Sequence, residues 1–136
     1  MKRLAIAAAL VFLAAPAVSA DDLTGASGLL CSPAQATVCN PEDGCETAPP
    51  WVWNIPSFIK VNLDEKTMST TEASGENRVT PIANVQRSGG RIFLQGVERG
   101  RAFSFVVDEA TGMITAAVAR DGFTVSVFGA CTPAAK

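Results

Sequence analysis

RAFSFVVDEATGMITAAVARDGFTVSVF, residues 101–128, contains the most regular hydrophobic pattern in the chain. Apolar and polar or small residues alternate there in three segments, 101–108, 113–120 and 123–128. Alternation of this kind is typical of half-buried strands. The first loop ends on Gly112, and Asp121-Gly122 in the second is a strong signal for a tight hairpin. The stretch therefore predicts three antiparallel strands joined by two hairpins.

The alternation continues upstream to residue 57. Ile59, Val61 and Leu63 share one face of a predicted strand over 58–64. Further strands are predicted over 67–71, 79–87 and 91–97, although Pro81 suggests an edge position for the second of these. About seven strands with short connections predict an all-β, antiparallel meander domain over 57–133, followed by a C-terminal tail, 134–136.

A meander sheet has two edges that need protection, and curling is the usual remedy. We therefore expect a small antiparallel up-and-down β-barrel or a strongly curled meander sheet. An open sandwich is the alternative.

Residues 21–56 contain five prolines and three of the four cysteines, without sustained periodicity. The segment predicts an irregular arm held by disulfides. Cys39 and Cys45 are close enough for a local ring, which leaves Cys31 to pair with Cys131. The main rival pairs Cys31 with Cys39 and Cys45 with Cys131. The spacings do not match zinc sites, so no metal and no other cofactor is expected.

Residues 1–20 have the character of a secretory signal peptide. Lys2 and Arg3 precede an apolar run over 4–15, and small residues lead to a cleavage point before Asp21. Such a run is shorter than the roughly 20 residues of a membrane anchor, so no membrane insertion is expected after cleavage. We expect a periplasmic or secreted protein whose cysteines oxidise.

Residue types that are missing restrict the possible functions. The chain has no His and no Tyr, which excludes Ser-His-Asp and Cys-His catalysis. A carboxylate-based hydrolase using Glu98, Asp108 or Glu109 stays as an alternative. Without Lys2 and Arg3, 9 of the 11 Lys and Arg remain against 13 Asp and Glu. This acidic balance, without a basic cluster, disfavours nucleic acid as a partner.

Two features suggest a binding surface. Trp51 and Trp53 flank Val52, so in an extended segment both indoles would project to one side as an aromatic platform or pack as a lid over the barrel. Arg91, Arg99 and Arg101 are expected to surround one hairpin end, where Arg99 and Arg101 could hold an anion or all three could keep an edge soluble.

The polar loop Ser74-Gly75-Glu76-Asn77-Arg78 resembles the Ser-Gly-rich loop of small periplasmic lysozyme inhibitors with a disulfide-stapled β-barrel. The resemblance covers these five residues, and Val79 stands where that family has an aromatic residue. It implies that Ser74 and Arg78 would enter the cleft of a lysozyme.

The barrel interior is a third possible site, because small closed barrels can hold one apolar ligand. Its predicted lining is Phe103, Phe105, Ile114, Val118, Phe123 and Val125, with Ala116 leaving room. The sequence thus favours an exported, non-enzymatic binding module, with another protein as the most plausible partner and inhibitor-like action as one possibility. A small-molecule carrier that uses the interior is the alternative.

Overall fold

The computed structural model describes residues 21–74 and 77–135. The predicted signal peptide, residues 1–20, lies outside the described residues, as does the last residue of the predicted tail. Gly75 and Glu76 of the polar loop also lie outside them.

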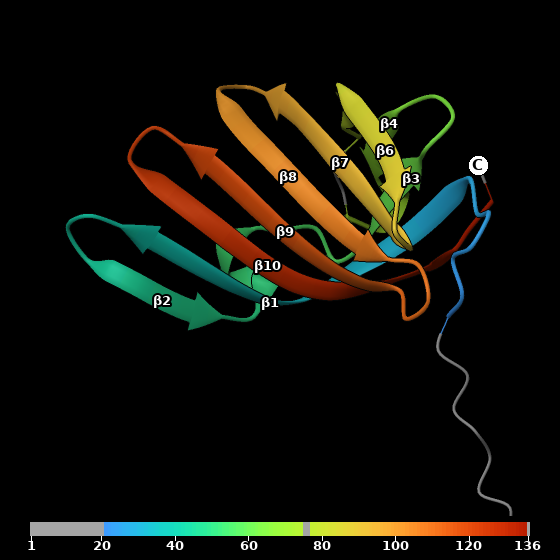
Figure 1. Ribbon diagram of the computed structural model, residues 1–136. Coiled ribbons are helices and arrows are strands. Elements are labelled where there is room, and N and C mark those ends of the chain that lie inside the picture. The colour runs from blue at the N-terminus through green and yellow to red at the C-terminus, as the bar shows by residue number, and fades with distance from the viewer. Residues whose placement is uncertain (1–20, 75–76, 136) are drawn as a thin grey trace, which may run out of the picture.

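The described chain is all-β, which confirms the predicted fold class. Its strands are β1 (Gly28–Asn40), β2 (Gly44–Ala48), β3 (Ile59–Asn62), β4 (Thr67–Thr70), β5 (Val79–Pro81), β6 (Asn84–Ser88), β7 (Arg91–Glu98), β8 (Arg101–Asp108), β9 (Met113–Arg120) and β10 (Phe123–Pro133). They form one antiparallel sheet in the order β5-β4-β3-β1-β10-β9-β8-β7-β6, with β2 paired to β1. The sheet curls into a half-barrel (Figure 1), and β5 contacts β7.

The predicted irregular arm is wrong for residues 28–48, which form β1 and β2. β1 is the longest strand, with 13 residues, and lies in the middle of the sheet between β3 and β10. Its periodicity is hidden because a bulge between Pro33 and Gln35 shifts the register. Leu29 and Cys31 are buried before the bulge and Ala36 after it, so the inward positions change from odd to even.

The strand predicted over 79–87 is two strands at opposite edges of the sheet. β5 pairs with β4, and β6 pairs with β7. Between them Ile82 is buried, and its N–H donates to the carbonyl of Lys66 at 2.8 Å. The chain therefore passes directly from one edge to the other, which is possible because the curled sheet brings its edges together.

Each disulfide joins residues that lie directly opposite each other on neighbouring strands. Cys31 of β1 bonds to Cys131 of β10, and Cys39 of β1 bonds to Cys45 of β2. This is the preferred of the two pairings considered from the sequence. Cys31–Cys131 lies within the sheet, rather than tying a loose arm across it. Two disulfides indicate an oxidising environment.

The densest packing fills one end of the half-barrel. Leu29, Ile92, Leu94 and Val107 are almost fully buried there. Leu23 covers this end, and its N–H donates to the carbonyl of Glu109 at 2.7 Å. The other end of the concave face is not packed in this way, and this leaves space for a site.

Candidate functional site

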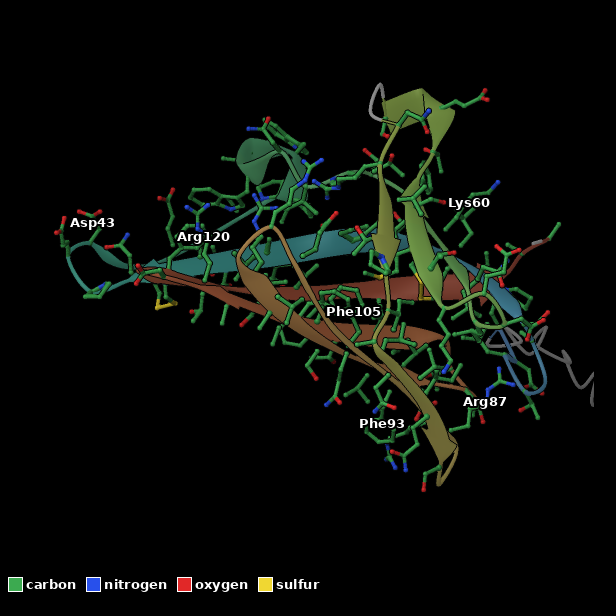
Figure 2. The ribbon with its side chains drawn as sticks, turned by 90° about the horizontal axis from the view of Figure 1, so that it is seen from above. Asp43, Lys60, Arg87, Phe93, Phe105 and Arg120 are labelled. Carbon is green, nitrogen blue, oxygen red and sulfur yellow. A yellow bond between two sulfur atoms is a disulfide. The ribbon has the colours of Figure 1, made fainter. Side chains whose placement is uncertain are left out.

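The concave face of the half-barrel contains a half-open cavity of about 480 Å³. β8, β9 and β10 form its floor, and residues of η1, a 3-10 helix over Pro50–Trp53, and of the β4–β5 hairpin form its walls. Figure 2 shows η1 and the β4–β5 hairpin projecting from the same side of β1 and β10. Cavities that hold small molecules are commonly about 300–1,000 Å³ and mostly apolar.

The floor follows from the alternation of apolar residues in β8, β9 and β10. Every residue predicted for the barrel interior lines the cavity: Phe103, Phe105, Ile114, Ala116, Val118, Phe123 and Val125. The same strands present small and hydroxyl residues such as Ser104, Ala117 and Ser126 on the exposed convex face. Alternate side chains of each strand therefore face the cavity, and those between them face solvent.

Small residues keep the floor open. Ala116 is buried and packs with Ala36 and Val127 in a minor apolar cluster. Gly96 lies opposite Phe103 in the β7–β8 pair, and a side chain at Gly96 would overlap the ring of Phe103. Gly96 thus lets this ring lie against β7 instead of filling the cavity.

The two indoles do not project to one side, because the segment that carries them is not extended as the prediction assumed. Residues 50–53 are a 3-10 helix, started by Pro50 and ended by Asn54 in the left-handed conformation. Two residues along a 3-10 helix point to different sides, unlike two residues along a strand. The side chain of Trp51 is 72% exposed, whereas Trp53 lines the cavity and packs against the minor apolar cluster.

The indole of Trp53 carries an unusual polar atom. Its Nε1 is buried and has no hydrogen-bond partner among the described residues. A buried donor without a partner costs roughly 1–3 kcal/mol. Trp53 therefore occupies the wall for its apolar contacts and gains nothing from its N–H in this arrangement.

A polar corner completes the cavity. Arg78 before β5, Glu98 at the end of β7 and Arg101 at the start of β8 all line it. All three are half-buried. Thr80, the buried polar residue of β5, also lines the cavity.

The remaining predicted binding residues lie elsewhere. The hydroxyl of Ser74 donates to the carbonyl of Thr71 at 2.6 Å, and Ser74 does not line the cavity. Arg99 is exposed at the tip of the β7–β8 hairpin with φ 47°, next to Gly100. Arg91 lies at the opposite end of this hairpin, paired in register with Asp108, so the three arginines do not surround one hairpin end.

The carboxylates considered for a hydrolase are separated in the same way. Glu98 lies at one end of the β7–β8 hairpin, and Asp108 and Glu109 lie at the other. The carboxylate of Glu109 pairs with Arg87 at 3.0 Å. The pKa of Asp108 is lowered mainly by a hydrogen bond from the Thr111 hydroxyl and next by one from the Thr111 backbone N–H. The Asp108 carboxylate therefore stabilises a loop and does not face a cleft.

In residues 21–74 and 77–135 no group of three or more His, Cys, Asp or Glu side chains could hold a metal ion. Over the same residues no helix combines the length and apolar character needed to cross a membrane.

No protein-family profile, curated protein or solved structure matches this chain. The cavity and its residues are therefore the basis for the function proposed below.

Several residues of the cavity were not expected from the sequence. Pro33 and Ile55 come from the segment expected to be an irregular arm, and Met68 and Thr80 come from β4 and β5. Alternation in β4 places Met68 and Thr70 on one face, a signal that the sequence did contain. The position of Ile55 depends on how η1 packs, for which the sequence has no local signal.

Proposed function

We propose that the protein binds a small apolar molecule on its concave face, as the carrier alternative anticipated. The observation that carries this proposal is the unfilled cavity of about 480 Å³ above an apolar floor. A half-barrel that needed only stability would fill this space with larger side chains, because interiors are normally close-packed. Ala116 lines the cavity and is small at a position where such filling would occur.

We also propose that the chain is exported and acts in the periplasm or outside the cell. The signal-like residues 1–20 and the two disulfides support this compartment. A carrier of apolar molecules fits this location, because such molecules are poorly soluble in the aqueous space between membranes.

A neutral fluorescent probe, N-phenyl-1-naphthylamine, tests the cavity directly. We expect saturable binding of one probe per protein, with increased probe emission. Ala116→Leu places a larger side chain on the floor and should weaken binding by about tenfold, since it removes volume that the ligand needs. Ala117→Leu, the next residue on the exposed convex face, is the matched control and should bind as the parent protein does.

A second readout does not depend on the folding of the Ala116 variant. Trp51→Phe leaves Trp53 as the one tryptophan, because the chain has two. Trp53 lines the cavity, so its emission should shift when the probe binds. Absence of saturable binding, or equal binding by Ala116→Leu and Ala117→Leu, would refute the proposal. Native mass spectrometry without reductant would then show no ligand copurifying with the protein.

One observation supports the alternative that the protein binds another protein. Trp51 is 72% exposed and the adjacent Val52 is 43% exposed on η1. Exposed aromatic residues are typical anchors of protein interfaces. If this surface binds a protein, a tagged chain should capture a near-stoichiometric partner from the cell envelope, and Trp51→Ala should abolish the capture.

A further inference from the structure

The path of the chain brings two arginines of the cavity to the same corner. β6 runs antiparallel to β7 as far as the pair Asn84–Gln95. The chain before β6 continues beside the last residues of β7, because the carbonyl oxygen of Pro81 would lie 3.2 Å from a Cβ placed on Gly96. β5 therefore extends toward the β7–β8 turn. Arg78, which precedes β5, consequently lies at the same corner as Arg101.

Neither guanidinium has a partner in the part of the chain that the structure describes. The ion pair between Arg87 and Glu109 lies at the other end of the sheet (Figure 2 labels Arg87). Glu98 is the register partner of Arg101, but their charged atoms do not come within ion-pair distance. A half-buried charge without a partner is unfavourable, because it has lost part of its water and gained nothing in exchange.

This corner is positive although the whole chain is acidic. Arg120 is paired in register with Arg101, and its guanidinium lies 4.5 Å from the ring centre of Phe123, which lines the cavity. Arg99 is at the adjacent hairpin tip, so this end carries four arginines: Arg78, Arg99, Arg101 and Arg120. Among the described residues, Glu98 and Asp121 also lie at this end, and Glu72 lies in the β4–β5 loop that leads to Arg78. A local excess of positive charge next to an apolar surface attracts anions.

We propose that the ligand of the cavity is an anionic amphiphile with a carboxylate head and an apolar tail. Arg78 and Arg101 hold the carboxylate by charged hydrogen bonds, and the tail lies on Phe103, Phe105 and Val125. With Glu98 included, the three charged residues lining the corner have a net charge of one, which matches a monoanion. This inference rests on the proposed carrier function and adds the chemical class of its ligand.

Dodecanoate and dodecanol form a matched pair that differs in the head group. Both are measured at pH 8 by displacement of N-phenyl-1-naphthylamine. We expect dodecanoate to bind about tenfold more tightly than dodecanol, since a charged hydrogen bond is worth roughly that factor. Arg101→Met and Arg78→Met should each reduce this preference, with little change in the affinity for dodecanol or the neutral probe.

Two further variants make the result independent of a folding defect. Arg91→Met removes the same charge at the opposite end of the β7–β8 hairpin and should leave the preference unchanged. Glu98→Gln removes the carboxylate from the corner and should tighten dodecanoate binding several-fold without affecting dodecanol, because a like charge is lost.

The outcomes separate the two proposals. If the neutral probe binds but dodecanoate and dodecanol bind equally, the anionic head is wrong and the carrier function stands. If Glu98→Gln and the arginine variants leave the preference unchanged, the assigned corner is wrong. If the neutral probe itself does not bind, both the carrier function and the ligand class are refuted.

Discussion

At the scale of single residues, Asp108 shows how local chemistry fixes a turn. Its Oδ1 accepts hydrogen bonds from the backbone N–H groups of Ala110 and Thr111, at 3.1 Å and 3.0 Å, and from the Thr111 hydroxyl at 3.0 Å. These bonds favour the charged form. They lower the pKa of Asp108 from its ordinary value of 3.8, and the side-chain bond of Thr111 is the largest cause.

We expect Thr111→Ala to raise the pKa of Asp108 toward its ordinary value, because the largest stabilising contact of the carboxylate is removed. Thr111→Ser keeps a hydroxyl and serves as the control. Carboxyl carbon NMR, followed through an acid titration, measures both. An unchanged pKa in Thr111→Ala would contradict this interpretation of the loop.

The lowered pKa also has a consequence for stability. Because the pKa is lower in the folded state, Asp108 contributes stability above pH 3.8, and this contribution is lost as the pH falls through the folded-state pKa. In Asp108→Asn, the free energy of unfolding should therefore decrease less as the pH falls below 3.8.

At the scale of secondary structure, β1 pairs with three other strands, β10, β3 and β2. One edge of β1 pairs with β10 along most of its length, and the other pairs first with β3 and then with β2. Both disulfides begin on β1, but they close rings of very different size, with sequence separations of 100 and 6. The larger ring restricts the unfolded chain far more.

We expect Cys31→Ala with Cys131→Ala to lose about 4–5 kcal/mol of unfolding free energy, against about 2 kcal/mol for Cys39→Ala with Cys45→Ala, in the chain-entropy account. Each double variant is the control for the other. Urea denaturation monitored by circular dichroism measures both losses. The reverse order would show that unfolded-chain entropy is not the dominant effect of these disulfides.

At the scale of the whole molecule, the central strands of the half-barrel are paired on both sides, whereas its edge strands are paired on one side. β1 and β10 lie in the middle of the sheet, whereas β2, β5 and β6 each pair with one neighbour. The open cavity lies above β8, β9 and β10, so a ligand there would contact these inner strands as well as Arg78, which precedes the edge strand β5.

Hydrogen exchange under native conditions should therefore be slowest in β1 and β10 and fastest in β2, β5 and β6, because strands with one neighbour open locally with little loss of packing. Mass spectrometry of peptic fragments resolves these strands. Uniform exchange across the sheet would indicate that the protein opens only as a whole.

The floor of the site could be predicted from the sequence, because the same alternation of residues predicts both the strands and the side chains that face inward. The floor residues, from Phe103 to Val125, follow from alternation and from turn residues such as Gly112 and Gly122, which have φ values of 70° and 85°. These are local effects. The walls depend on η1 and β5, whose positions are set by contacts far away in the sequence. The extended segment assumed for Trp51 and Trp53, which would place both indoles on one side, was wrong for that reason.

The amino-acid sequence by itself determined that the chain is an antiparallel β-protein, which strands follow one another after residue 90, and which side chains face inward. Only the tertiary structure decided that β1 lies at the centre, that the sheet stops at a half-barrel, and that Arg78 and Arg101 line the same cavity. Period-two alternation and hairpin turns act between neighbouring residues, so they can be read locally. Curvature and the meeting of distant edges depend on the sum of all strand pairings, which no local segment specifies.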